Sequence, residues 1–252
     1  MKTQFIAKEH DSLLIIPIIN EGSRIINQLK AIEKIRNRNF DILLADGNSK
    51  DGSIENIIAD YSKLVNTLII VTNSRGLSHQ LRVAFRYGLD HRYKYFVTMD
   101  GNNKDDAQGI QSIISKLMQG FDFVQGSRFI RTNSSFNTPL HRIFAIKFIH
   151  APIVSFASRN KYTDTTNGFR GFSSNLLDSK EIGIFRDIFC QYELIPYIPI
   201  KVGKLKLKSC EVPVIRRYPI KTKTPTKING LNAHLRILKS LFLSAIGYYD
   251  PK

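Results

Sequence analysis

Short apolar runs in the first hundred residues alternate with segments whose apolar positions recur at helical spacing. The first run, residues 13–19, ends in a polar turn at 20–22 and is followed by apolar residues at helical spacing over 25–35. The same unit recurs, with strands expected at 40–45, 67–72 and 95–99 and helices at 54–64 and 76–89. Strands and helices that alternate at this spacing predict a mostly parallel sheet flanked by helices.

The second half of the chain is less regular. Residues 121–128 and 163–173 are expected to be strand or loop segments, with an apolar helix at about 139–158 between them. The alternating segment after Gly203 predicts a strand that leads into a basic loop at 216–227. The last segment predicts an amphipathic helix, with its apolar stripe formed by Leu231, Leu235, Leu238, Leu241, Phe242 and Ala245.

Length and charge narrow the class of protein. The 252 residues, 42% of them hydrophobic, suffice for one substantial core. The 37 Lys and Arg against 21 Asp and Glu give a net charge of +16, which favours anionic partners such as phosphates, lipid head groups or nucleic acid. No stretch approaches the roughly 20 uninterrupted apolar residues of a membrane-spanning helix, so we expect a soluble or peripheral protein. Cys190 and Cys210 lie far apart and predict two free thiols in a reducing cytoplasm.

Polar residues gather after each expected strand in the first half of the chain. The four clusters are residues 20–21, 46–53, 74–79 and 100–106. Their carboxylates and amides could hold a base, a ribose or a metal, and Arg75 near a helix N-terminus suits a phosphate. Because ligands of a parallel sheet bind beyond the carboxyl ends of its strands, the clusters together predict a nucleotide cleft. Taken alone, the cluster at 46–53 could equally be a helix cap made by Asp51 or Ser53.

Six segments occur in a fixed order between about Leu13 and Arg217. They are IIPIINEGSRI, ADGNSKDGS, VTMDGNNKDD, FDFVQGSRF, DTTNGFRGF and YELIPYIPIKVGKLKLKSCEVPV. Together they resemble family-2 glycosyltransferases of the GT-A fold, in the polyprenyl-phosphate branch typified by dolichol-phosphate mannosyltransferase. The resemblance implies an α/β, Rossmann-like GT-A domain at 1–215, with a nucleotide-binding half at about 1–120 and an acceptor half at 121–215. Residues 216–252 would add the basic loop and the C-terminal amphipathic helix.

The resemblance also implies a donor site for a UDP- or GDP-linked sugar. Its residues would be Pro17, Asn20, Glu21, Asp46, Arg75, Gly76, Asp100 and Asn102. Asp100 would be the first Asp of the DxD motif, but Asn102 stands in place of the second, and Lys104 stands where the family often has a metal-facing polar residue. Divalent ions prefer carboxylate oxygens, so we expect a weakened site in which Asp100 and Asn102 hold Mg²⁺ or Mn²⁺. Lys104 could instead supply part of the charge, or the segment could be a solvated turn.

On the acceptor side, the resemblance assigns lipid or donor phosphates to Arg128, Arg142 and Arg170, and Lys227 in the basic loop could close over the phosphates. Asp100, Arg128 and Arg170 would be the catalytic residues. The planar guanidinium suits two-point binding of phosphate oxygens. Arg170 could instead form a buried ion pair with Asp164 or Glu193, and Lys227 could belong to a solvated charge run.

The nature of the acceptor follows from whether a base is needed. A sugar hydroxyl needs a carboxylate base, whereas a phosphate is already an anionic nucleophile. DTTNGFRGF stands where saccharide-elongating relatives carry a Glu-Asp pair, which favours inverting transfer to a polyprenyl phosphate. Three alternatives stay open: saccharide elongation with Asp164 or Glu193 as base, a catalytically inactive nucleotide-binding homologue, and a nucleic-acid-binding module. The last is disfavoured, because no such module is recognisable and the basic residues are spread along the chain.

Two apolar helices suggest where the protein works. The helix at 139–158 and the C-terminal helix could rest in the membrane interface and receive the lipid, with basic neighbours attracted to anionic lipids. We therefore expect a peripheral protein at the cytoplasmic face of a membrane. The alternative is that the helices pack on the core or on a second copy in a homo-oligomer.

Overall fold

A central sheet of eight strands organises the protein. The computed structural model describes residues 2–220 and 231–251, the side chains of residues 231, 232 and 234 excepted. The strand order is β1-β4-β3-β2-β5-β8-β6-β9, and a second sheet pairs β10 with β7. The strands are β1 (Lys2–Gln4), β2 (Ser12–Ile18), β3 (Asp41–Asp46), β4 (Thr67–Ile70), β5 (Tyr95–Thr98), β6 (Phe123–Ser127), β7 (Ser135–Phe136), β8 (Arg170–Ser173), β9 (Ser209–Pro213) and β10 (Arg216–Arg217).

Most neighbours in the central sheet are parallel. Strands β4, β3, β2 and β5 run in one direction, and β6 runs parallel to β9. Strand β8 is antiparallel to both of its neighbours, β5 and β6, and β1 is antiparallel to β4 at one edge. The expectation of an α/β fold with a mostly parallel sheet is therefore confirmed.

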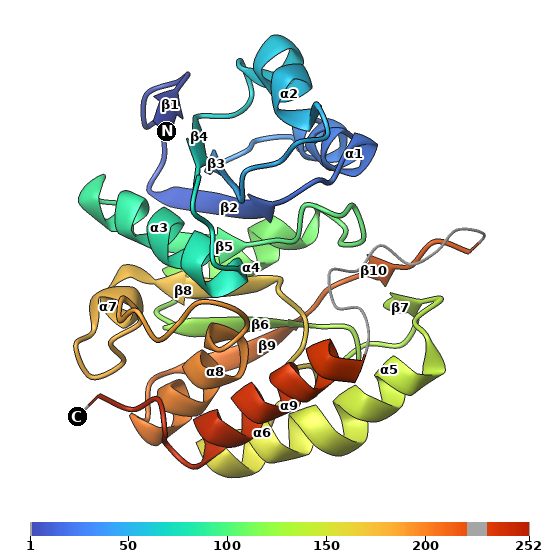
Figure 1. The fold of residues 1–252 in the computed structure, drawn as a ribbon, viewed down its shortest axis with the longest axis vertical. Coiled ribbons are helices and arrows are strands. Elements are labelled where there is room, and N and C mark those ends of the chain that lie inside the picture. Colours follow the sequence, from blue (N-terminus) through green and yellow to red (C-terminus); the bar gives the residue numbers. More distant parts are fainter. Residues whose placement is uncertain (1, 221–230, 252) are drawn as a thin grey trace.

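Helices cover both faces of the sheet (Figure 1). Their bounds are α1 (Ser23–Glu33), α2 (Ser53–Tyr61), α3 (Leu77–Asp90), α4 (Gly109–Met118), α5 (Leu140–Ala145), the π-helix η1 (Ile146–His150), α6 (Ala151–Ser158), α7 (Ser174–Asp178), α8 (Leu194–Lys204) and α9 (Leu231–Ala245). Alternate residues of β2 enter two different cores because successive side chains of a strand point to opposite faces. Leu13 joins the core with α3 and α8, and Leu14 joins the core with α1, α2 and α4.

Several segments differ from the sequence-based expectation. Helices α4, α7 and α8 and strands β1 and β7 were not expected, and the alternating segment after Gly203 is a strand only from Ser209 onward. Residues before it end α8 in a turn, where Lys206 takes a φ of 56°. Leu205 and Leu207 pack on the core from this turn, so the alternation in the sequence marks burial of two leucines and not an extended strand.

The helix that runs from Leu140 to Ser158 corrects another expectation. Helices α5, η1 and α6 form one unit of 19 residues, and within residues 2–220 and 231–251 it alone is long and apolar enough to cross a membrane, judged by length and composition. Counting uninterrupted apolar residues missed it, because Arg142 and Lys147 interrupt the run. Only 17% of its apolar window is buried within the protein. Its outward face carries Leu140, Phe144, Phe148 and Phe156, which are 83%, 59%, 67% and 89% exposed.

Candidate functional site

The strand order places a crevice between β2 and β5. In the sheet, β3 and β4 lie on one side of β2, and β5 lies on its other side. The connections that follow β2 and β5 therefore lead in opposite directions. Ligands of open α/β sheets bind at such a switch point, beyond the carboxyl ends of the strands. A cavity of about 20 Å³ lies here, and its lining includes Pro17 of β2, Asp100 after β5, Gly168 and Arg170. The structure thus brings the expected site residues Pro17, Asp100 and Arg170 together.

The polar loops after β2 and β3 are tied to each other. The buried Asp46 carboxylate accepts hydrogen bonds from the backbone N–H of Asn48 and Ser49, both at 2.9 Å. The Ser49 hydroxyl accepts from the Asn20 N–H at 2.8 Å, and the Asn20 side chain accepts from the Lys50 N–H at 2.7 Å. Asp46 and Asn20 therefore shape this end of the crevice.

Acidic residues next to these loops also serve local structure. Asp51 accepts from the Gly22 N–H at 2.7 Å and from the Ser53 hydroxyl at 2.6 Å, so it links the two loops. The buried Glu21 accepts from Arg24 at 2.9 Å. Asp51 also accepts from the backbone N–H of Ser53, the first residue of α2, at 3.2 Å, so the alternative of a cap by Asp51 is confirmed and Asp51 serves both the helix and the loops.

Gln80 is a site-shaping residue that the sequence did not indicate. From the buried face of α3, its amide nitrogen donates to the carbonyl oxygens of Ile18 and Ala45, each at 2.9 Å. These carbonyls lie at the ends of β2 and β3, and Ile18 also accepts from the Gly47 N–H at 2.8 Å, so Gln80 ties the two strand ends together. A polar residue inside the apolar stripe of a helix was the available signal.

The loop with Arg75 and Gly76 packs against the segment 187–191. Arg75 pairs with Asp187 at 3.1 Å, and its side chain is 49% exposed. Gly76 has a φ of 135°, and a Cβ there would lie 2.9 Å from the Cys190 carbonyl. The loop is bound to residues 190–191 by backbone hydrogen bonds from Ser78 and His79. Arg75 does not line the cavity beside Asp100, and its contact with the nucleotide stays a prediction.

Asp100 pairs with an arginine whose proximity the sequence analysis did not predict. Arg216, on β10, donates to Asp100 at 2.8 Å and to the buried Asp105 at 2.5 Å, and it also reaches the side-chain oxygen of Asn167 at 3.2 Å. Burial alone would raise the pKa of Asp100, but the charges of Arg216 and Lys104 hold it below its usual range. Burial raises the pKa of Asp105 despite the pairing with Arg216.

Four cations surround the ring of Tyr218. Lys104, Arg142 and Arg216 lie 5.1, 5.8 and 5.9 Å from the ring centroid, and Arg128 donates to the phenol oxygen at 3.3 Å. Burial would raise the pKa of Tyr218, but these four charges lower it. Burial and the charge of Arg216 lower the pKa of Lys104 to about 8. Four cations at one place suit an anionic ligand.

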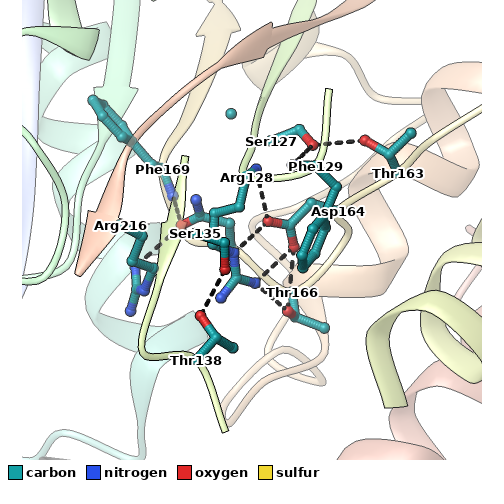
Figure 2. A network of polar contacts seen from close by, with 12 residues as sticks. Ser127, Arg128, Phe129, Ser135, Thr138, Thr163, Asp164, Thr166, Phe169 and Arg216 are labelled. Atoms are coloured by element: carbon teal, nitrogen blue, oxygen red, sulfur yellow. Dashed lines mark hydrogen bonds and ion pairs between the residues drawn. The ribbon is translucent and has the colours of Figure 1, made fainter. Parts of the chain in front are cut away.

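Arg128 forms a buried, two-point ion pair with Asp164 (Figure 2). Its Nε donates to one carboxylate oxygen at 2.6 Å and its Nη2 donates to the other at 2.8 Å. The charge of Arg128 holds the pKa of Asp164 below its usual range, although burial acts in the opposite direction. Glu211 supports the pair by accepting from the backbone N–H of Thr163 and Asp164. The pair occupies Nε and Nη2 of Arg128 and leaves Nη1, which donates to Tyr218, as the nitrogen that a phosphate could reach; that role stays a prediction.

Arg170 binds backbone carbonyls. Its guanidinium donates to the carbonyl oxygens of Asn167, Ile195 and Thr165 at 3.0, 2.7 and 2.6 Å, and the residue is 1% exposed. The alternative of an ion pair with Asp164 or Glu193 is wrong, because Asp164 pairs with Arg128 and Glu193 accepts from the N–H groups of Cys190 and Gln191. Arg170 thus joins the loops beneath Asp100, and a direct contact with phosphate stays a prediction.

The Arg216 guanidinium occupies an Asp100 oxygen that a divalent ion would need, while Asn102 Oδ1 and Asp105 Oδ1 are buried without a hydrogen-bond partner among the described residues, so a metal ion held by Asp100 and Asn102 stays a prediction. One Asp100 oxygen already accepts from Arg216 and, at 3.3 Å, from the Asn102 amide. Asp105 is buried against the same guanidinium. A divalent ion needs carboxylate oxygens free of other cations. Within the described part of the chain, three clustered potential ligands occur at Glu9, His10 and Asp41, at the opposite end of β3. Lys227 lies outside the described residues.

Comparisons with known proteins agree with this geometry. Residues 13–180 match the family described as Glycosyl transferase family 2. A dolichol-phosphate mannosyltransferase of Mycosarcoma maydis is 33% identical over 106 residues, which cover 41% of this chain and 35% of that protein. A dolichol-phosphate mannosyltransferase of Pyrococcus furiosus is 24% identical over 219 residues, which cover 86% of this chain and 59% of that protein. The matched regions thus span between about a third and three-fifths of these two relatives.

A solved structure shows the same fold. Glucosyl-3-phosphoglycerate synthase of Mycobacterium tuberculosis, in complex with Mn²⁺, UDP and glucosyl-3-phosphoglycerate, superposes with a TM-score of 0.68 at 13% identity. The match covers 96% of this chain and 81% of that one.

Proposed function

The chain belongs to Glycosyl transferase family 2, and from this premise we propose that it transfers a sugar from a nucleotide sugar to a polyprenyl phosphate. It is a glycosyltransferase with the GT-A fold. In the proposed reaction, an oxygen of the acceptor phosphate attacks the anomeric carbon of the donor sugar. The bond from that carbon to the diphosphate breaks with inversion, and its electron pair leaves with the nucleoside diphosphate.

The observation that carries the acceptor class is the cation cluster around Tyr218. Lys104, Arg128, Arg142 and Arg216 gather at one place beside Asp100. Guanidinium groups suit the binding of phosphate oxygens, and preorganised cations stabilise charge that develops on a leaving group. A site of this charge favours two phosphate-bearing substrates, the donor diphosphate and an acceptor phosphate.

The carboxylates support the same conclusion. Saccharide elongation would need a base, and the two candidates were Asp164 and Glu193. Asp164 is fully buried in its pair with Arg128, and one Glu193 oxygen accepts two backbone N–H groups. A phosphate acceptor does not need to lose a proton, so it is the better match. The names of two relatives, dolichol-phosphate mannosyltransferases, point to the same class of acceptor.

The exposed apolar helices suggest where a lipid acceptor would be met. Helix α6 packs on α9, and α5, α6 and α9 lie together at the end of the molecule opposite α2 (Figure 1). Phe144 and Phe148 on the first helical unit and Phe242 on α9 are all more than half exposed. Apolar side chains of this kind on a basic protein favour binding in the interface of an anionic membrane. We propose that the protein works at the cytoplasmic face of that membrane.

A direct assay tests the proposal. The purified protein is incubated with a panel of UDP- and GDP-linked sugars and a polyprenyl phosphate in detergent, and both nucleotide release and lipid product are followed by mass spectrometry. We expect a glycosylated lipid phosphate with one donor, lost in Asp100→Asn. Nucleotide release that requires a saccharide acceptor in place of the lipid would overturn the proposed acceptor and favour elongation.

A further inference from the structure

We propose that Arg216, assisted by Lys104, takes the place of a divalent metal ion at Asp100, so that the chain binds the donor diphosphate without metal. The inference rests on the proposed function, because it concerns the donor of that reaction. In GT-A enzymes that use a metal, the ion would offset the charge of the diphosphate and would itself be held by carboxylates. Here a guanidinium lies between the carboxylates.

The contacts of Arg216 define this position. Its Nη2 binds Asp100 at 2.8 Å and its Nη1 binds Asp105 at 2.5 Å, so one cation joins both acidic side chains of the loop after β5. A metal ion at Asp100 would have to compete with this guanidinium. Lys104, from the same loop, lies over the same Tyr218 ring as Arg216 and adds a second positive charge.

Arg216 retains hydrogen-bonding capacity beyond these two ion pairs. The residue is 5% exposed, and its buried Nε–H donates to no group of the described residues. Leaving a charged donor unsatisfied in a buried place is costly, which argues for an anionic oxygen that completes it when substrate is bound. The Asp100 side chain beside it is 29% exposed, so the site opens toward ligand on that side.

The backbone holds Arg216 in place before any ligand arrives. Its N–H donates to the Ser134 carbonyl at 2.9 Å, and the N–H of the next residue, Arg217, donates to the Lys104 carbonyl at 2.8 Å. These hydrogen bonds connect β10 to residue 134, beside β7, and to the loop after β5. Preorganised charge costs no rearrangement at the moment of reaction, which is how a fixed cation stabilises a transition state.

The cations of the cluster outnumber its carboxylates. Four cations, Lys104, Arg128, Arg142 and Arg216, face the carboxylates of Asp100, Asp105 and Asp164. If the buried Arg170 is not counted, the cluster has one more cation than carboxylates. When the bond to the anomeric carbon breaks, its electron pair stays on the diphosphate oxygen, and Arg216 and Lys104 would offset that charge.

Binding of UDP and GDP, measured by calorimetry on the full chain, tests the inference without an acceptor. The protein is first treated with EDTA, and each nucleotide is then titrated with EDTA or with Mn²⁺ present. We expect one nucleotide to bind with dissociation constants that agree within about threefold in the two conditions, a difference below 1 kcal/mol. In EDTA, Arg216→Gln should weaken that binding by about 10- to 100-fold, the loss typical of a charge-assisted contact.

A neighbouring arginine provides the matched control. Arg217 carries the same charge, but its side chain is 55% exposed, in a loose ion pair with Asp106 at 3.5 Å. Arg217→Gln should leave nucleotide affinity unchanged. Equal losses in Arg216→Gln and Arg217→Gln would mean that net charge alone matters, and this would overturn the inference.

A second variant distinguishes a loss of binding from a loss of folding, because Arg216→Gln leaves Asp105 buried without its cation. Arg216→Gln combined with Asp105→Asn removes that charge and should fold, yet bind nucleotide as weakly as Arg216→Gln in EDTA. Nucleotide binding that requires Mn²⁺ in the unaltered chain would overturn the inference and leave the proposed function standing. Binding of neither UDP nor GDP in either condition would overturn both.

Discussion

The Arg216 guanidinium lies 2.8 Å from the Asp100 carboxylate, although 116 positions separate the two residues in the chain. The pair joins the end of β5 to β10 and places a cation at the acidic residue that the DxD resemblance singles out. It also explains how a loop with one Asp where two are expected can still bind an anionic donor. Four further expectations follow from the structure.

Gly168 is needed for the position of Asp100. A Cβ at residue 168 would lie 2.7 Å from the Asp100 Oδ1 atom, closer than real Cβ contacts allow. Gly168→Ala should therefore displace the carboxylate and lower kcat/KM by about 100-fold, as misplacement of a reacting group by about 1 Å can do. Steady-state kinetics measures the loss, and thermal unfolding should show that the variant is folded. Unaltered kinetics in a folded variant would show that the Asp100 position is not critical.

The buried pair of Arg128 and Asp164 should matter for stability. Arg128→Met leaves the Asp164 carboxylate buried without its cation, so the free energy of unfolding should fall by about 3–5 kcal/mol. Adding Asp164→Leu removes the stranded charge and should recover much of that loss. Urea denaturation of the two single variants and the double variant measures the coupling. Additive losses would contradict a direct partnership of these side chains.

Lys104 should make nucleotide binding depend on pH. Burial and the charge of Arg216 lower its pKa to about 8, so its positive charge is lost as the pH rises through that value. Affinity for the nucleoside diphosphate should fall over the same range, and Lys104→Arg, which keeps its charge, should abolish this fall. The contribution of Lys104 to stability has the opposite sign. The unfolded chain binds the proton more tightly, so the free energy of unfolding should rise between about pH 8 and 10.5.

The outward face of the helix Leu140–Ser158 should bind membranes. Phe148 is 67% exposed, and burying a phenylalanine side chain is worth about 1.5–3 kcal/mol. Phe148→Ser should therefore weaken binding to vesicles that contain anionic lipid by about tenfold or more. Ile58→Ser is the control, because Ile58 is also exposed but lies on α2, at the other end of the molecule (Figure 1). Equal losses in a vesicle flotation assay would argue against a specific membrane-binding face.

Local patterns in the sequence were enough to predict the parallel strands of the first half and the edge of the sheet at which their polar clusters gather. Runs of buried residues, each followed by a polar turn, indicated β2, β3, β4 and β5 and the helices between them. The carboxyl ends of parallel strands meet at one edge, so the polar clusters with Asn20, Asp46 and Asp100 could be placed there from their order alone.

Only the tertiary structure decided which charges meet. Arg128 pairs with Asp164, Arg170 binds three carbonyls, and Arg216 reaches Asp100. These choices depend on the antiparallel insertion of β8 between β5 and β6 and on the pairing of β10 with β7. The partners are distant in sequence, and the local sequence around an arginine does not indicate whether its guanidinium will be buried or exposed. The sequence by itself therefore determined the alternating strands and helices of the first half and the edge at which the polar clusters gather, because both follow from local periodicity. The charge arrangement within the site depends on long-range packing, so only the folded chain could decide it.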